Sequence, residues 1–323
     1  MIYCLHSSLL KKEKSVLPKI LIIPIGNKCN LNCGFCKIHS KKQSLKISIE
    51  NIFKVIDWYK ELNPNGYVTF YGGEPLANKK YLDIVRYVLG KKLKFCLITN
   101  GALINEKNVC DLKGVTKVVV SLDSHIKETH DTLRGISGTF EKTTNAMRML
   151  CSRDMNVFSS MVLTSKNLNH FIEYCDFCEN LGAKPIFNII EPNYTLGNMN
   201  GFYMSEYRIT NNQRNALESV LIEYQKRYPE FLSVLRLNSI LDYVDTYNNR
   251  LSKYPNICDY KAIILENSEE IYVKNCFRDK GRTKISNFQD LKDSWENEAN
   301  RKEVLSCTKY CSINCMNRFE TVD

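Results

Sequence analysis

Cysteine is the residue type through which this sequence has the most chemistry to offer. The chain of 323 residues contains 14 cysteines, and two groups of them stand out. Cys29, Cys33 and Cys36 form the first group, within eight residues. Thiolates favour zinc and iron–sulfur clusters among the metals that proteins bind. The second group lies toward the C-terminus and comprises Cys258, Cys276, Cys307, Cys311 and Cys315.

Disulfides are the other common use of cysteine, and the N-terminus argues against them. Lys11, Lys12 and Lys14 come before a secretory core could form, so we predict no signal peptide. A long chain without an export signal is expected in the cytoplasm, where thiols stay reduced and bind metals. The apolar runs are too short to predict a membrane span. The net charge is +10, but the lysines form no long basic block, so we expect no nucleic-acid partner.

The first cysteine group supplies three ligands, whereas a structural zinc site or an ordinary cluster needs four. No fourth cysteine follows at a suitable spacing, and His39 is the only nearby histidine in the sequence. Three protein ligands leave one metal position open, which is typical of a catalytic site. A zinc knuckle completed by His39 or by a distant cysteine is the alternative.

These cysteines belong to a regular alternation of predicted strands and helices. Such an alternation implies an α/β fold with a parallel sheet and right-handed crossovers, either open or curled into a partial barrel. Runs rich in Ile, Val, Phe and Tyr have the length of buried strands, and they span residues 20–25, 67–71, 93–98, 116–122, 157–163 and 185–190. Apolar stripes at helical spacing follow them, at residues 49–59, 81–88, 105–112, 140–150, 168–181 and 217–224.

Glycine and polar residues recur where these strands end. The first cysteine group follows the first strand, and Gly72 and Gly73 follow the second. Asn100 follows the third strand and Ser121 lies at the end of the fourth. Ligands of parallel α/β folds bind at this carboxyl edge, and adjacent glycines let a ligand approach the backbone closely. We therefore predict a ligand site there.

The spacing Cys-x3-Cys-x2-Cys, with an aromatic residue before the last cysteine, resembles the radical S-adenosylmethionine (radical SAM) superfamily. The resemblance covers residues 20 to about 190. It implies a partial (β/α)6 barrel in which the three cysteines hold a [4Fe–4S] cluster. S-adenosylmethionine would chelate the open iron, and an electron from the reduced cluster would cleave it to methionine and a 5′-deoxyadenosyl radical. Further motifs typical of the family follow in order, namely Gly72-Gly73-Glu74-Pro75, Thr99-Asn100-Gly101, Ser121-Leu122-Asp123, His130-Asp131, Arg134-Gly135 and Gly138-Thr139-Phe140.

The same resemblance assigns contacts to S-adenosylmethionine. Simpler alternatives are a turn for the glycine pair, a helix N-terminal charge for Glu74 and a surface ion pair for Arg134. Asp123 and His130 are interpreted as turn and cap residues. The implied contacts are Gly72, Gly73 and Glu74 to the methionyl end, Phe35 to the adenine through its backbone, Ser121 to the ribose, Arg134 to the carboxylate, and Asn100 at the same edge.

The second cysteine group resembles the auxiliary-cluster domains of the superfamily, called SPASM when full-length and twitch when shortened. Cys258 and Cys276 flank a predicted hairpin over residues 262–265 and 271–274. The full form carries seven cysteines for two clusters, whereas this group has five, so we expect one auxiliary [4Fe–4S] cluster. Cys307 is the expected spare ligand. A zinc site made from the same residues is the alternative.

These patterns divide the chain into four segments. Residues 1–19 are a predicted extension, residues 20–230 the radical SAM core, residues 231–257 a linker and residues 258–323 the small C-terminal metal-cluster domain. Nineteen residues before the first strand are too few for the peptide-recognition domain that peptide-modifying members often carry, so we expect no such fused domain.

Three other cysteines are predicted to pack as small hydrophobic residues. Cys175 and Cys178 lie one helical turn apart beside an apolar stripe, and a redox pair is the alternative. Cys96 lies in a predicted strand, and a hydrogen-atom donor is the alternative there.

The resemblance implies a radical SAM oxidoreductase or maturase that abstracts a hydrogen atom from its substrate. Members of the family oxidise, cross-link or epimerise ribosomal peptides and protein side chains, and others act on sugars or cyclitols. A peptide or protein substrate is our first interpretation, and dehydrogenation or epimerisation of a carbohydrate-like small molecule is the second. A reductant such as flavodoxin or ferredoxin would supply the electron. A non-catalytic iron–sulfur electron-transfer or assembly protein is the third interpretation, although such a protein has no use for a methionine-binding edge.

Overall fold

The computed structural model of the chain describes residues 17–36, 38, 48–78, 80–190, 206–232, 234–247, 262–267, 270–274 and 283–297. The proposed zinc ligand His39 lies outside these ranges, as does the whole second cysteine group, Cys258, Cys276, Cys307, Cys311 and Cys315. The auxiliary cluster and its zinc alternative therefore stay predictions.

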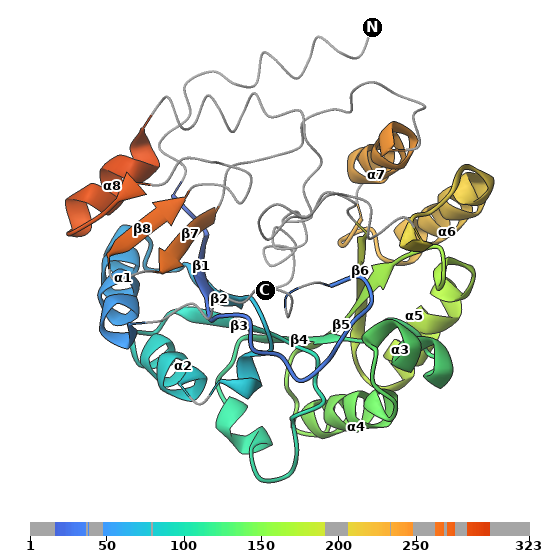
Figure 1. The fold of residues 1–323 in the computed structure, drawn as a ribbon, viewed down its shortest axis with the longest axis horizontal. Helices are drawn as coiled ribbons and strands as arrows, with labels where there is room; N and C mark the ends of the chain where they lie inside the picture. Colours follow the sequence, from blue (N-terminus) through green and yellow to red (C-terminus); the bar gives the residue numbers. More distant parts are fainter. Residues whose placement is uncertain are drawn as a thin grey trace, which may run out of the picture.

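A parallel sheet of six neighbouring strands forms the centre of the fold, in the order β6-β5-β4-β3-β2-β1. Most of its side chains are buried, because helices cover one face and the sheet curls around the other (Figure 1). Burial on both faces explains why these strands read as continuous apolar runs. The six predicted strands are confirmed as β1 (Ile20–Pro24), β2 (Tyr67–Tyr71), β3 (Lys94–Thr99), β4 (Lys117–Ser121), β5 (Val157–Leu163) and β6 (Lys184–Ile189).

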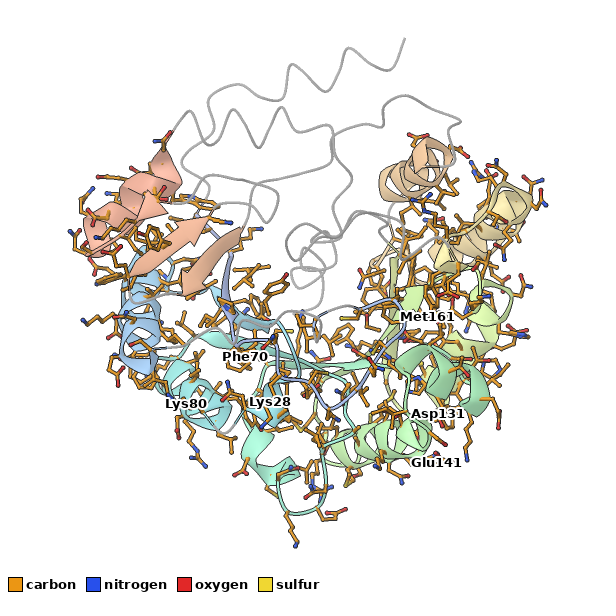
Figure 2. The ribbon with its side chains drawn as sticks, in the orientation of Figure 1. Lys28, Phe70, Lys80, Asp131, Glu141 and Met161 are labelled. Atoms are coloured by element: carbon orange, nitrogen blue, oxygen red, sulfur yellow. The ribbon has the colours of Figure 1, made fainter. Side chains whose placement is uncertain are left out.

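Helices follow the strands and lie on the convex side of the curved sheet (Figure 1). Apolar side chains from the two layers meet between them and form the main core (Figure 2). Five of the predicted helices are confirmed as α1 (Ile49–Leu62), α2 (Tyr81–Gly90), α4 (Thr139–Cys151), α5 (Phe171–Asn180) with the short η4 (Leu168–His170) before it, and α6 (Arg214–Arg227) with η6 (Asn211–Gln213) before it.

Several helical segments differ from the prediction. The weak stripe over residues 105–112 forms only a short 3-10 helix, η3 (Val109–Leu112). Three α-helices were not predicted. Helix α3 (Lys127–Arg134) lies within the motif-rich stretch after β4, α7 (Val234–Tyr247) lies within the predicted linker, and α8 (Phe288–Glu296) lies within the predicted C-terminal domain. The sequence of α3 is polar, and only His130, Leu133 and Arg134 are buried, so it shows no apolar stripe.

The predicted C-terminal hairpin is confirmed as β7 (Ala262–Asn267) and β8 (Ile271–Lys274), which pair antiparallel. β7 also pairs in parallel with β1, and β9 (Thr283–Lys284) follows β8, so these strands extend the main sheet. The helix α8 (Phe288–Glu296) contacts α1. The domain boundary at residue 258 stays a prediction.

No helix in the described part of the chain is both long and apolar enough to cross a membrane.

Candidate active site

The loop after β1 carries Cys29, Cys33 and Cys36 at the carboxyl edge of the sheet. Cys33 is buried and the other two thiols are half-buried. Burial raises the pKa of Cys33 to about 11, and burial also raises the pKa of Cys29. The thiol of Cys36 adds to both shifts, so the three groups lie within electrostatic range of one another. Apolar side chains surround them, namely Leu31, Phe35, Leu133 and Ile190.

The loop after β2 is bonded directly to this cysteine loop. Gly73 donates its N–H to the carbonyl of Gly26 (2.8 Å), and Glu74 donates to that of Lys28 (2.9 Å). A Cβ atom on Gly73 would lie 2.0 Å from the carbonyl oxygen of Lys28, and one on Gly72 would lie 2.3 Å from that of Gly26. Gly72 also has a φ of +131°, which disfavours other residues. Glycine is therefore required at both positions because the backbone of the cysteine loop lies against them, independently of any ligand contact.

Glu74 fixes the glycine loop to the end of β3. Glu74 is 3% exposed, and its carboxylate accepts hydrogen bonds from Thr99 Oγ1 (2.7 Å), the Asn100 N–H (2.8 Å) and the Leu76 N–H (3.1 Å). Burial raises the pKa of Glu74, and these three donors oppose the rise. The contact with Leu76 caps the short helix η2 (Pro75–Ala77), as the simpler interpretation of Glu74 held. A contact with S-adenosylmethionine stays a prediction.

Asn100 connects the end of β3 to the cysteine loop. Its Nδ2 donates to Asn30 Oδ1 (2.8 Å), while its carbonyl accepts from Thr143 Oγ1 (2.9 Å) on α4. Ser121 is the last residue of β4 and is half-buried at the same edge. The structure thus joins the cysteine loop, the glycine loop and Asn100, and it places Ser121 at the same edge of the sheet, as the strand ends predicted.

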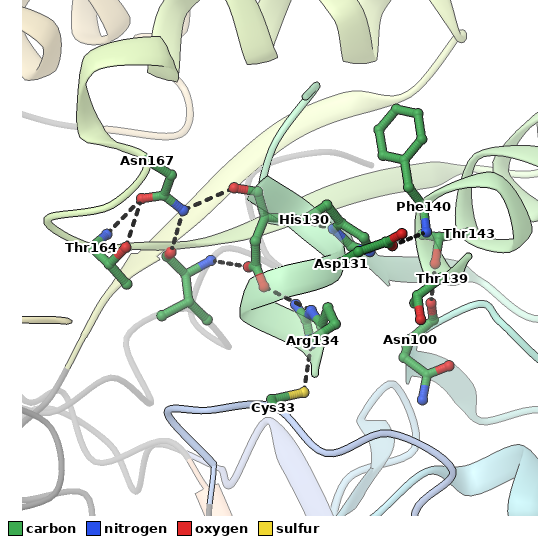
Figure 3. A network of polar contacts seen from close by, with 12 residues as sticks. Cys33, Asn100, His130, Asp131, Arg134, Thr139, Phe140, Thr143, Thr164 and Asn167 are labelled. Atoms are coloured by element: carbon green, nitrogen blue, oxygen red, sulfur yellow. Dashed lines mark hydrogen bonds and ion pairs between the residues drawn. The ribbon is translucent and has the colours of Figure 1, made fainter. Parts of the chain in front are cut away.

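Arg134 lies in a buried polar network that reaches Cys33 (Figure 3). Its Nε pairs with Asp123 Oδ2 (2.7 Å), and its Nη1 donates to the Sγ of Cys33 (3.8 Å). The guanidinium also lies 5.6 Å from the ring centre of Phe35. Burial alone would lower the pKa of Arg134, but Asp123 and Cys33 raise it. The ion pair is therefore not at the surface, in contrast to the simpler interpretation of Arg134.

The C-terminal end of α3 also anchors the cysteine loop. The N–H of Asn32 donates to the carbonyl of Arg134 (3.2 Å), and the N–H of Gly34 donates to that of Leu133 (3.1 Å). The helix ends at Gly135, which has a φ of +73° and where a Cβ would lie 2.1 Å from the carbonyl oxygen of Asn32. The motif Arg134-Gly135 thus has a structural role beside any cofactor contact.

Sequence reasoning missed the importance of Asp123 and His130. Asp123 is completely buried, and its N–H donates to Nδ1 of His130 (3.1 Å). Asp131 accepts hydrogen bonds from the N–H groups of Gly138 and Phe140 and holds the start of α4. A usable signal was present, because an aspartate directly after a buried strand needs a buried partner.

Tyr207 was also missed, and it packs on the cysteine loop. Its ring lies edge-on to Phe35, with the ring centres 6.0 Å apart, and its hydroxyl fills the space beside Gly34. By contrast, the core-packing interpretation of Cys96, Cys175 and Cys178 agrees with their complete burial.

Residues 23–178 match the family model described as the radical SAM superfamily. This part of the chain belongs to the radical SAM superfamily. Among curated relatives, the subtilosin biosynthesis protein AlbA of Bacillus subtilis is 30% identical over 174 residues, which are 52% of this chain and 38% of AlbA. An AdoMet-dependent heme synthase of Oleidesulfovibrio alaskensis is 28% identical over 169 residues, 51% of this chain and 43% of the relative. The match therefore spans less than half the length of each relative.

Solved structures share the radical SAM fold over most of the chain. SuiB of Streptococcus suis, bound to the precursor peptide SuiA, has a TM-score of 0.66 at 18% identity and covers 93% of this chain and 73% of its own. The anSMEcpe enzyme with bound AdoMet has a TM-score of 0.65 at 21% identity, and the likeness covers 90% of this chain and 84% of anSMEcpe. At these identities the likeness establishes the fold alone.

The donor set of this radical SAM domain fits an iron–sulfur cluster. A four-iron cluster takes each cysteine ligand on a separate iron, so three cysteines would leave one iron open. All three donors of the loop are sulfur, and apolar side chains line them, which suits such a cluster.

Proposed function

We propose that the chain is a radical SAM enzyme that modifies a peptide or protein side chain by hydrogen-atom abstraction. The observation that carries the proposal is the joining of three strand ends around the thiols. Backbone hydrogen bonds connect the cysteine loop to the loop of Gly72 and Gly73, and a side-chain bond connects it to Asn100. We place this activity in the reducing cytoplasm.

In this proposal Cys29, Cys33 and Cys36 hold a [4Fe–4S] cluster, and S-adenosylmethionine binds beside it at the carboxyl edge. Such a cluster, once reduced by a flavodoxin- or ferredoxin-like partner, supplies the electron that cleaves S-adenosylmethionine homolytically. The chain's own contribution is to position these groups. Glu74 is already satisfied by three donors, so it holds the loop in place, and the backbone around Gly73 and the hydroxyl of Ser121 face the ligand.

A peptide substrate is supported by the names of several relatives. AlbA belongs to bacteriocin biosynthesis, a second Bacillus subtilis relative is the sporulation killing factor maturation protein SkfB, and SuiB is bound to a precursor peptide. Four of the five C-terminal cysteines, with Cys307 as the spare, would hold one auxiliary cluster. That cluster would supply an electron acceptor for an oxidation or a cross-link.

The substrate experiment uses peptides encoded beside the gene, synthesised with deuterium on their side chains and α-carbons. We expect deuterium to move from one peptide carbon to the 5′-carbon of 5′-deoxyadenosine, measured by mass spectrometry. Omitting the peptide is the control for uncoupled cleavage. Cleavage of S-adenosylmethionine that never transfers deuterium from any such peptide would contradict the peptide assignment.

A second candidate substrate is a tetrapyrrole. It is favoured by relatives named as AdoMet-dependent heme synthases and an Fe-coproporphyrin III synthase, the latter 27% identical over 179 residues. Incubation with iron-coproporphyrin III tests it, because a porphyrin product of changed mass would favour this candidate over the peptide. The carbohydrate-like substrate remains an alternative, and the deuterium-transfer experiment tests it when deuterated sugars replace the peptides.

A further inference from the structure

The guanidinium of Arg134 donates a hydrogen bond to Cys33, one of the proposed cluster ligands. The residue is 7% exposed, and two of its three nitrogens have partners within the protein. Nε is paired with the carboxylate of Asp123 at 2.7 Å, and Nη1 donates to the sulfur of Cys33 at 3.8 Å. The resemblance to the family implied a different role, a contact with the carboxylate of S-adenosylmethionine.

Asp123 holds the guanidinium in this orientation because hydrogen bonds fix the residue on several sides. Its Oδ1 accepts the N–H of Val162 (2.9 Å) on β5, which leaves Oδ2 facing Arg134. Its backbone N–H donates to Nδ1 of His130, and its carbonyl accepts from Nδ2 of Asn167 (2.8 Å). The backbone of Asp123 is thus held on both sides, and the bond to its Oδ1 keeps Oδ2 directed at the arginine.

We propose that Arg134 and Asp123 form a buried pair that sets the reduction potential of the cluster held by Cys33. Arg134 donates a hydrogen bond to the thiolate sulfur, and Asp123 positions the guanidinium and balances part of its charge. This inference rests on the proposed function, because it requires the cluster. Both residues are positioning residues, since they act through Cys33.

The direction of each effect follows from electrostatics. Reduction adds one negative charge to the cluster and its thiolate ligands, so a hydrogen-bond donor and a positive charge beside a ligand sulfur favour the reduced state. Few water molecules reach a buried pair, so screening is weak. Removing the charge of Arg134 must therefore lower the potential. Removing the charge of Asp123 must raise it.

The test compares Arg134→Gln and Asp123→Asn with the wild type, each as full-length protein reconstituted with iron and sulfide. Arg214→Gln is the matched control, because Arg214 is also largely buried and paired, with Asp245 (3.1 Å) and Glu218 (2.9 Å), but it lies on α6. Electron paramagnetic resonance follows a reductive titration of the signal that changes when S-adenosylmethionine is added. That response identifies the cluster of the first cysteine group.

We expect the midpoint potential to become more negative in Arg134→Gln and more positive in Asp123→Asn, with Arg214→Gln at the wild-type value. Unchanged potentials in both variants, with the cluster loaded, would overturn the inference. So would a loss of affinity for S-adenosylmethionine in Arg134→Gln at an unchanged potential, because that result assigns the arginine to the ligand.

Removal of a buried charge can prevent folding, so Arg134→Lys provides a second variant. Lysine keeps the positive charge but replaces the rigid fork, whose Nε and Nη1 reach Asp123 and Cys33 separately, with one flexible ammonium group. We expect a negative shift smaller than that of Arg134→Gln, and a wild-type potential would overturn the inference. Failure of the proposed function looks different, because the wild type would then show no signal that responds to S-adenosylmethionine.

Discussion

Replacing Gly73 with alanine tests whether the glycine loop serves the protein's own backbone. The new Cβ would lie 2.0 Å from the carbonyl oxygen of Lys28, a distance at which one of the two loops must move. That movement stretches the hydrogen bonds from Gly73 to Gly26 and from Glu74 to Lys28. We therefore expect the metal-free protein to lose stability before any cofactor is involved.

The magnitude has two contributions. Overpacking against a fixed backbone atom costs about 1–3 kcal/mol. Each of the two backbone hydrogen bonds contributes about 0.5–1.5 kcal/mol, so Gly73→Ala should lower the free energy of unfolding by about 2–6 kcal/mol. Such a loss is large against the ~5–15 kcal/mol that stabilises a typical protein.

Equilibrium unfolding in urea, without iron or S-adenosylmethionine, measures this loss. Gly90→Ala is the matched control, because Gly90 is the last residue of α2 and its Cβ would meet nothing within 4 Å. There alanine should stabilise the helix by about 0.5–1 kcal/mol. A Gly73→Ala variant as stable as the wild type, but unable to bind S-adenosylmethionine, would refute the reasoning and assign the glycine to the ligand alone.

Three further predictions concern the histidine network and the two cysteine groups. Burial lowers the pKa of His130 to about 3, and the positive charge of Arg134 contributes to the shift. Below about pH 6.5 the unfolded chain therefore binds a proton at His130 that the folded chain does not bind. The free energy of unfolding should fall by up to about 1.4 kcal/mol per pH unit between about pH 6.5 and about pH 3. His130→Asn keeps an acceptor for the Asp123 N–H and should flatten the pH dependence of urea unfolding, whereas an unchanged slope would contradict the low pKa. With Cys29, Cys33 and Cys36 all changed to alanine, iron analysis should find roughly four irons per chain on the C-terminal group; zinc instead, or about eight irons, would contradict a single auxiliary cluster. Cys276→Ala should keep S-adenosylmethionine cleavage but stop product formation, and a soluble variant that still makes full product would disprove that role.

The strands were predictable because a parallel sheet buried on both faces leaves continuous apolar runs in the sequence. Helix α3 could not be predicted, because its residues are polar and its position is fixed by contacts of Leu133 and Arg134 with the cysteine loop. Those contacts join residues about one hundred positions apart, so no local pattern reports them. The parallel pairing of β7 with β1 could not be predicted for the same reason, because it places Ala262 opposite Ile20, which is far away in the sequence.

The candidate site was predictable to the level of its strand ends but not of its contacts. The motifs assigned Glu74 and Arg134 to contacts with S-adenosylmethionine, and those contacts stay predictions. In the structure both residues contact the cysteine loop. The sequence could not reveal that Glu74 is already satisfied by three donors or that Arg134 is paired with Asp123. Such pairings depend on the register between neighbouring strands, for example the pairing of Thr99 on β3 with Val120 on β4. That register is known only once the chain is folded.

Cleavage of S-adenosylmethionine is the measurement that tests the central claim most directly. Wild-type protein, reconstituted without oxygen and reduced with dithionite, should convert S-adenosylmethionine to 5′-deoxyadenosine and methionine. Cys33→Ala should abolish this conversion, because two thiolates cannot hold the cluster with an open iron, whereas Cys110→Ala, at an exposed cysteine of η3, should leave it unchanged. Undiminished 5′-deoxyadenosine formation by Cys33→Ala, or none by an iron-loaded wild type, would contradict the assignment.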